Sequence, residues 1–198
     1  MKDDKYWNDF YKNNKKDLES PSSFARFVVD KIKNINTVVE LGCGNGRDTF
    51  ELIKFYKKII SLDSSKNTIE FLRTKNLNNA TFLHMDASDV SNLKIIPDLI
   101  YSRFFWHSIN ENSENNILSW AAGLPSGTIF AMECRSDKDE KLYKNFQQKH
   151  YRRYINLNSI IGKLNLSGYN IEYHEESKGL ARYKKEDPYI IRIIARKK

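Results

Sequence analysis

Residues 38–48 have the sequence VVELGCGNGRD, in which a β-branched and aliphatic run leads into three closely spaced glycines. Glycine lacks a Cβ, so Gly42, Gly44 and Gly46 permit tight turns and let the backbone approach a ligand closely. In nucleotide-binding α/β sheets, ligands bind outside the carboxyl ends of the strands, where such turns occur. The segment therefore predicts a buried strand, a ligand-binding turn and a following helix.

The regions around this turn alternate between short β-branched runs and helical patterns, which is typical of βα units around a parallel sheet. Strands are expected at 37–41, 59–62, 80–83, 99–101 and 128–133. Helices are expected at 22–33, 47–56, 66–75, 137–153 and 159–166, and Asn-rich loops at 76–79 and 110–116. Two further strands, 169–174 and 189–195, have no helix between them and predict a hairpin at the sheet edge. The predicted fold class is α/β with seven strands.

The composition predicts one domain over residues 1–198, because 40% hydrophobic residues suffice for a sizeable core. The uncharged stretch 117–132 contains two glycines and a proline and is too short to cross a bilayer. The N-terminus is charged where a secretory signal would need its apolar region, so a cytoplasmic protein with no membrane partner is expected. Cys43 and Cys134 cannot form a disulfide framework or a metal cluster, and no metal site is expected.

The net charge of +8 is unevenly distributed along the chain. Residues 1–134 hold 17 basic and 17 acidic side chains, whereas residues 135–198 hold 16 and 8. A basic patch would favour an anionic partner, either a phosphorylated small molecule or a nucleic acid. The alternative is that the excess reflects a solvated basic tail and an Asn/Lys/Ile-rich composition.

Two acids follow the glycine turn at equal spacing: Asp63 lies 23 residues after Glu40, and Asp86 lies 23 residues after Asp63. An acid at the end of the second strand is placed to accept both hydrogen bonds of a ribose diol. The glycine spacing departs from the GxGxxG dinucleotide fingerprint, and Glu40 would repel a pyrophosphate. S-adenosylmethionine has an ammonium group, a ribose and no phosphate, and therefore fits these residues better.

The sequence resembles the class I S-adenosylmethionine-dependent methyltransferases over roughly residues 22–195. The most specific segments are ELGCGNGRDT at 40–49 and SLDSS at 61–65. The resemblance implies a Rossmann-like, seven-stranded, mostly parallel sheet with helices on both faces and a C-terminal antiparallel hairpin. It also implies an enzyme that uses S-adenosylmethionine and releases S-adenosylhomocysteine.

The resemblance further implies a cofactor site at the ends of the first four strands. Its expected residues are Glu40, Gly42, Gly44, Gly46, Arg47, Asp63, Ser64, Asp86, Ala87 and Ser102. Glu40 and the glycines would line the methionine moiety, Asp63 would hold the ribose, and Asp86 with the backbone of Ala87 would contact adenine. Two assignments have ordinary alternatives, because Asp86 also fits a turn cap and Arg47, expected at the cofactor carboxylate, also fits a surface position.

Catalysis is expected in the segment after the fourth strand, YSRFFWHSI at 101–109. The sulfonium donor is already activated, so much of the catalysis can come from positioning. A hydroxyl or phosphate-type acceptor also calls for a base or a charge clamp. His107 titrates near neutrality and is the candidate base, and Arg103 is the candidate clamp. In the alternative, the three aromatic residues of the segment are core and His107 caps the next helix.

An anionic acceptor pocket is expected from residues within 135–188, treated as acceptor-side insertions in the domain. The candidates are His150, Arg152, Arg153, Arg182 and Tyr183, since arginine forks and tyrosine hydroxyls suit phosphate or carboxylate. The HYRRY and YSRFFWHSI segments resemble small-molecule methyltransferases associated with surface polysaccharide biosynthesis. That resemblance implies O-methylation of a phosphorylated or phosphoramidate-bearing sugar precursor. A solvated helix face with interface aromatics is the alternative.

Residues 1–21 are expected to form a lid over the cofactor. They include the aromatic side chains of Tyr6, Trp7, Phe10 and Tyr11. Aromatic faces stabilise a sulfonium by cation–π attraction. The alternatives are packing onto the sheet or onto a second subunit, and the sequence leaves open whether the protein is a monomer or a dimer.

Four functions were weighed from the sequence. A methyltransferase for a small, polar, anionic molecule is favoured, and nucleic acid is not the expected partner. An RNA methyltransferase would explain the basic C-terminal third, but the Asn/Asp-Pro-Pro-aromatic motif of amino-directed nucleic-acid enzymes is absent after the fourth strand. A non-catalytic nucleoside-binding partner subunit would retain Glu40 and Asp63 without an acceptor pocket. An NAD-dependent dehydrogenase is disfavoured by the glycine spacing.

Overall fold

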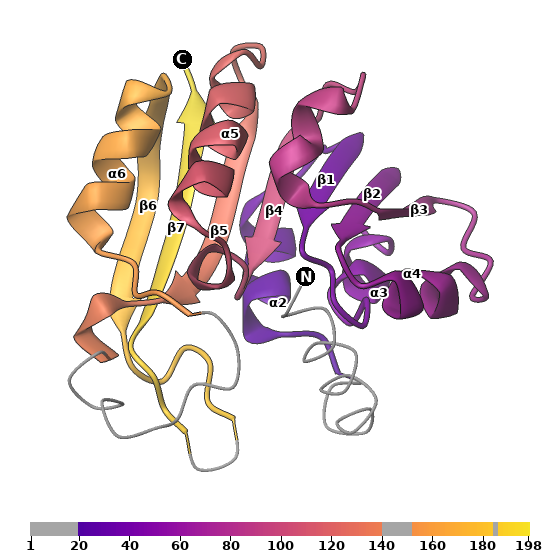
Figure 1. Cartoon of the computed structure of the whole chain (residues 1–198), viewed down its shortest axis with the longest axis horizontal. Helices are drawn as coiled ribbons and strands as arrows, with labels where there is room; N and C mark the ends of the chain where they lie inside the picture. The colour runs from indigo at the N-terminus through magenta and orange to yellow at the C-terminus, as the bar shows by residue number, and fades with distance from the viewer. Residues whose placement is uncertain (1–19, 140–151, 184–185) are drawn as a thin grey trace.

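The protein folds around one seven-stranded sheet with helices on both faces (Figure 1). The computed structural model describes residues 20–139, 152–183 and 186–198. The strands, in chain order, are β1 Thr37–Leu41, β2 Lys58–Asp63, β3 Ala80–His84, β4 Leu99–Arg103, β5 Ile129–Arg135, β6 Tyr169–Ser177 and β7 Ile190–Lys197. Their order in the sheet is β3-β2-β1-β4-β5-β7-β6. All seven expected strands are confirmed.

The direction of the strands matches the expected fold class. β1, β2, β3, β4 and β5 pair in parallel, whereas β7 is antiparallel to both β5 and β6. β4, β5 and β7 show this in Figure 1, where the arrowhead of β7 points the opposite way from the other two. The winding reverses between β1 and β4, so the carboxyl ends of these two strands form the switch point at which α/β sheets bind ligands.

The α-helices are α2 Ser23–Lys31, α3 Thr49–Leu52, α4 Lys66–Arg73, α5 Glu111–Ala122 and α6 Leu157–Leu166. Serine and asparagine side chains cap four of them: Ser22, Ser65, Asn110 and Asn156 each accept a backbone N–H of the first turn. The described residues also contain three short 3-10 helices that were not expected, η2 Ala87–Asn92, η3 Trp106–Ser108 and η4 Asp137–Asp139. Within the described residues, no helix has both the length and the hydropathy that a bilayer span requires.

Three expectations for the helices were wrong in part. The Asn-rich stretch 110–116 begins helix α5 and is no loop, because Asn110 caps it and Ile117, Leu118 and Ala121 form its buried stripe. α3 is shorter than the expected 47–56, since residues 53–56 continue in tighter turns. Of the expected helix at 137–153, the described parts are the short η4 Asp137–Asp139 and non-helical residues 152 and 153. Residues 140–151 lie outside the described part.

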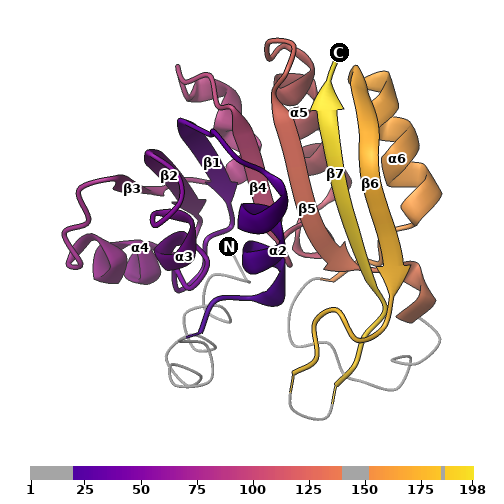
Figure 2. The same cartoon turned by 180° about the vertical axis from the view of Figure 1, so that it is seen from behind.

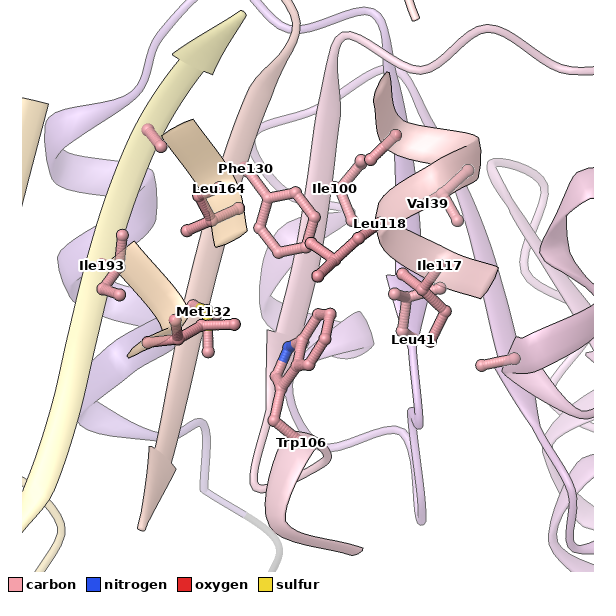
Figure 3. Packing of buried hydrophobic residues seen from close by; sticks show 14 of the residues in the cluster. Val39, Leu41, Ile100, Trp106, Ile117, Leu118, Phe130, Met132, Leu164 and Ile193 are labelled. Atoms are coloured by element: carbon pink, nitrogen blue, oxygen red, sulfur yellow. The ribbon is translucent and has the colours of Figure 1, made fainter. Parts of the chain in front are cut away.

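The two larger of three hydrophobic clusters hold the layers together, one on each face of the sheet. On one face, α5 and α6 pack against the sheet through a cluster that includes Trp106, Phe130 and Leu164 (Figure 3). On the other face, seen in front in Figure 2, α2 and α3 pack through Phe24, Val28 and Leu52. Both faces of β1 are therefore buried, which explains its continuous apolar run and makes Glu40 an exception that needs polar partners.

Candidate active site

The glycine turn joins β1 to α3 at the carboxyl edge of the sheet. Gly42 and Gly46 have φ angles of +72° and +78°, a region that side chains rarely adopt. A Cβ on Gly42 would lie 2.6 Å from the Phe105 ring, and a Cβ on Gly46 would lie 2.6 Å from Leu72. The backbone N–H groups of Gly42 and Cys43 both donate to the carbonyl oxygen of Leu62, at 2.9 Å, and fix the turn on the end of β2. Glycine at these positions is therefore required by the structure itself.

Asp63 ends β2 and lies beside the glycine turn. Its two carboxylate oxygens accept the backbone N–H groups of Gly44 and Ser65, each at 2.8 Å. The residue is half-buried. Two backbone bonds thus orient an ionised acceptor at the position expected for the ribose residue.

Glu40 lies in β1 with 2% of its surface exposed. Its Oε2 accepts the hydroxyl protons of Thr49 at 2.6 Å and Ser61 at 2.7 Å. Burial raises the pKa of Glu40 to about 7, and the two hydroxyls oppose this rise. Among the described residues no side chain donates to Oε1, so an ammonium donor has an acceptor there.

The other expected cofactor residues lie at the same edge of the sheet. The backbone N–H of Met85 donates to the Asp63 carbonyl at 3.0 Å, which brings Asp86 next to the end of β2. Asp86 caps η2 by accepting the N–H and hydroxyl of Ser88, so the turn cap considered from the sequence is present. Ala87 is buried and Ser64 is exposed. The contacts of these residues with adenine or ribose stay predictions.

Arg47 and Ser102 complete the expected cofactor set. Nε of Arg47 lies 3.9 Å from a carboxylate oxygen of Asp48. Ser102 is fully buried, pairs with Leu41 across β1 and β4, and accepts the indole N–H of Trp106 at 2.8 Å. Ser102 therefore anchors the turn after β4, a role that explains a serine here without a ligand.

The turn after β4 has an unusual backbone conformation at Phe104, whose φ is +52°. A bulky residue in this region costs of order 1–3 kcal/mol and persists only where the surroundings impose it. Here the Phe104 N–H donates to the carbonyl of Glu133 on β5, at 2.8 Å. The Trp106 bond to Ser102 closes the other side of the turn. The conformation is therefore held at both ends.

His107, the candidate base, is buried in η3. Its Nδ1 accepts the backbone N–H of Arg135 at 3.3 Å, and its carbonyl accepts the N–H of Arg153 at 2.9 Å. A ring nitrogen that accepts a hydrogen bond carries no proton, and its lone pair is not available as a base. This contact favours the structural alternative for His107, and its role as a base stays a prediction.

Arg103, the candidate charge clamp, belongs to a buried chain of ion pairs. Its Nε donates to Glu133 at 2.9 Å, and the other carboxylate oxygen of Glu133 accepts Nε of Arg192 at 2.8 Å. Glu133 is fully buried, whereas the Arg103 side chain keeps 18% of its surface exposed. The guanidinium of Arg103 lies 4.3 Å from the centre of the Phe104 ring. A charged and aromatic surface thus lies at the end of β4.

In the described part of the chain, the expected acceptor residues contact different partners, and these contacts do not bring them together in one pocket. Arg153 pairs with the buried Glu114 of α5, and Arg182 pairs with Asp187 at 3.2 Å in the segment between β6 and β7. Tyr183 forms an isolated bridge with Glu186. Arg152 is described but His150 lies outside the described residues, as do residues 1–19 of the expected lid at 1–21. Their roles in acceptor binding stay predictions.

Sequence reasoning missed Asp48, which is buried in the glycine turn. Its carboxylate accepts the backbone N–H and the hydroxyl of Ser22, each at 2.8 Å, and the hydroxyl of Tyr101 at 2.7 Å. The only available signal was its position in the GRDT part of the turn sequence. Glu133 and Arg192 were also missed, because Glu133 meets Arg103 and Arg192 through strands far apart in the chain.

Comparison with known proteins agrees with this geometry. Residues 38–124 match a family model described as a methyltransferase domain. A S-adenosylmethionine-dependent methyltransferase from Methanosarcina mazei is similar in structure, with a TM-score of 0.70 and 15% identity over 86% of this chain and 96% of that chain. The N-methyltransferase NodS from Bradyrhizobium japonicum, in complex with S-adenosylhomocysteine, is also similar in structure, with a TM-score of 0.68 and 15% identity. The similarity covers 88% of this chain and 83% of the NodS chain.

A sequence relative is the tRNA/tmRNA (uracil-C(5))-methyltransferase of Campylobacter hominis, which is 35% identical over 66 residues. The match covers 32% of this chain and 18% of that protein. Shared sequence is thus confined to a small part of a much longer enzyme.

Residues 38–124 thus match a methyltransferase domain, and the sheet has the fold of S-adenosylmethionine-dependent methyltransferases. The resemblance that the sequence suggested is confirmed at this level, and with it the expectation of an enzyme that takes S-adenosylmethionine as its cofactor. The association with polysaccharide biosynthesis, by contrast, finds no support among these comparisons.

Proposed function

We propose that this chain transfers the methyl group of S-adenosylmethionine to an oxygen atom of a small, polar, anionic acceptor. The observation that carries this proposal is the arrangement at the switch point of the sheet. The glycine turn, Glu40 and the backbone-oriented carboxylate of Asp63 line the ends of β1 and β2. The arginine and aromatic side chains after β4 lie beside them, because Ser102 pairs with Leu41.

The reaction is an in-line displacement at the methyl carbon. The acceptor oxygen forms a bond to that carbon while the bond to sulfur breaks, and the electron pair stays on sulfur to give S-adenosylhomocysteine. The hydroxyl proton leaves to a base or to water. The protein's own contribution is orientation: Asp63 and Glu40 fix the donor, and the turn 102–107 fixes the face from which the acceptor approaches.

The acceptor class that the sequence suggests is a phosphorylated or phosphoramidate-bearing sugar precursor of a surface polysaccharide. This part of the proposal rests only on the resemblance of the segments 101–109 and 150–154. An anionic group on the acceptor has separate support, since the Arg103 side chain is partly exposed at the end of β4.

RNA methylation is the second candidate, favoured by the similarity to the Campylobacter hominis enzyme and by the basic C-terminal third. Against it, most arginines of this third are already paired with carboxylates. Glu186, Glu114, Asp187, Glu133 and Glu172 pair with Arg135, Arg153, Arg182, Arg192 and Arg196, respectively. The excess charge thus forms less of an open phosphate-binding surface than the sequence suggested.

Incubation with methyl-labelled S-adenosylmethionine tests the proposal. The acceptor panel contains phosphorylated sugars, sugar nucleotides, sugar acids and total tRNA. We expect label in the small-molecule fraction, with loss of transfer in Asp63→Ala. Label in tRNA alone would support the second candidate. Absence of transfer together with absence of cofactor binding in calorimetry would contradict both.

A further inference from the structure

We infer that Arg103 binds an anionic oxygen group of the acceptor, a carboxylate or a phosphate, in a site organised by Glu133 and Arg192. The inference rests on the proposed function, because it names the group of the acceptor that this enzyme would hold. It places anion recognition at the end of β4, and no longer among the arginines predicted at 152–153 and 182.

The contacts of Arg103 leave part of its guanidinium unused. Nε donates to Glu133, and the flat face lies over the Phe104 ring. Among the described residues no acceptor is hydrogen-bonded to its two terminal nitrogens. The side chain is 18% exposed although it lies at the end of a buried strand. Two N–H donors in a planar fork are the geometry that carboxylate and phosphate oxygens fit.

The hydrogen-bond capacity of the neighbouring acids also leaves room for an anion. The carboxylate of Glu133 is shared between two guanidiniums, those of Arg103 and Arg192, and gives each of them one oxygen. Asp48, whose charge also acts on Arg103, accepts hydrogen bonds from Ser22 and Tyr101 instead. Arg103 therefore keeps N–H donors that an incoming oxyanion can use.

Glu133 and Arg192 act as positioning residues for Arg103. Glu133 is fully buried on β5, in register with Arg103 on β4. Arg192 is held in turn by the hydroxyl of Ser23 at 2.8 Å and the carbonyl of Leu180 at 3.1 Å. Each side chain in this chain of contacts has a fixed partner, so the fork of Arg103 is held in place before any ligand arrives.

The site lies next to the glycine turn. Phe105, two residues after Arg103, packs so closely on Gly42 that a Cβ there would lie 2.6 Å from its ring. Phe104 takes its left-handed conformation between these two side chains, and its ring faces the Arg103 guanidinium. An anion on Arg103 would therefore lie beside the end of the cofactor that the glycines receive, which is the reacting end in the proposed function.

Inorganic phosphate and acetate serve as probes, titrated into the full-length protein with and without saturating S-adenosylhomocysteine at constant ionic strength in chloride. The readouts are the NMR signals of the Arg103 Nε–H and of the Phe104 amide. We expect saturable shifts with at least one probe. Arg103→Gln should weaken that binding at least tenfold, and Arg103→Lys should weaken it less because it keeps the charge. Tighter binding of phosphate or of acetate tells which oxyanion the site prefers.

Arg196→Gln is the matched control, since Arg196 is an exposed, ion-paired arginine of β7 opposite the amino end of β5. It should leave both the probe affinity and the cofactor affinity unchanged. Absence of saturable shifts, or equal probe affinity in Arg103→Gln, would overturn the inference. A tenfold loss of S-adenosylhomocysteine affinity in Arg103→Gln would also overturn it, by placing Arg103 on the cofactor. If the cofactor fails to bind the unaltered protein, the proposed function fails, whereas the titration without cofactor still tests the anion site.

Discussion

Glu40 shows how one buried side chain links the fold to the cofactor. A carboxyl group between Val39 and Leu41 would be costly without partners, and the hydroxyls of Thr49 and Ser61 supply two. Burial still dominates, and the pKa of Glu40 is about 7. The group is therefore mostly protonated at pH 6 and mostly ionised at pH 8, within the range in which the enzyme can be assayed.

Cofactor binding should depend on pH through Glu40. A cofactor ammonium favours the ionised carboxylate, so binding at pH 6 requires proton release and the affinity should rise up to about tenfold between pH 6 and 7.5. Calorimetry at pH 6 in two buffers of different ionisation enthalpy measures the released proton. Glu40→Gln should remove both the proton release and the pH dependence. An equal pH dependence in that variant would show that another group titrates.

Asp63→Ala should weaken S-adenosylmethionine binding by about 1–3 kcal/mol, because a charged hydrogen-bond acceptor is lost. The backbone contacts with Gly44 and Ser65 mean that the glycine turn is loosened as well. Calorimetry measures the change, with Asp30→Ala on the exposed side of α2 as the control. Unchanged affinity would rule out the ribose assignment.

Single residues differ in how far the sequence could predict them. Asp63 was predictable because its position follows from the end of a strand that its β-branched run identifies. The partners of Arg103 were not, because Glu133 and Arg192 meet it only through the register of β4, β5 and β7. Asp86 and His107 show a third case, in which the residue type fits two roles and only the contacts favour one.

At the scale of elements, α2 is fastened to both halves of the candidate site through its first residues. Ser22 donates two hydrogen bonds to Asp48 in the glycine turn. Ser23 donates to the carbonyl of Leu180 at 2.6 Å and accepts from Arg192. The helix thus connects the cofactor turn with the segment between β6 and β7.

Asp48→Ala should destabilise the protein by about 3 kcal/mol, since it leaves three buried donors without an acceptor. Urea unfolding of the unaltered protein and the variant measures this difference. Asp30→Ala, at an exposed position of α2, should change the free energy of unfolding by no more than about 0.5 kcal/mol. A loss of unfolding free energy below about 1 kcal/mol for Asp48→Ala would show that the hydrogen bonds of Asp48 contribute little to stability.

Strands were easier to predict from the sequence than helices. Each strand has a β-branched run, although β4, β5 and β6 extend two or three residues further, because pairing with neighbouring strands continues into polar sequence such as Arg103 and Arg135. The helix α5 was missed because its Asn-rich first turn suggests a loop. Its cap at Asn110 and the stripe of Ile117, Leu118 and Ala121 were the signals that favoured a helix.

At the scale of the whole molecule, the order of the strands brings the separate sequence signals to one edge. β1 lies between β2 and β4, so the turn after β1 has Asp63 on one side and the segment from Ser102 to His107 on the other. The C-terminal pair β6 and β7 adds Arg192 to the same edge. The fold thus explains why residues spread over more than 150 positions form one candidate site.

The central claim is that the glycine turn, Glu40 and Asp63 together bind S-adenosylmethionine. A crystal structure of the protein with S-adenosylhomocysteine tests it most directly. The account predicts the amino group near Glu40, the backbone of Gly42 and Gly44 against the methionine part, and both ribose hydroxyls on the Asp63 carboxylate. A ligand bound elsewhere, or a ribose held by other residues and not by Asp63, would contradict it.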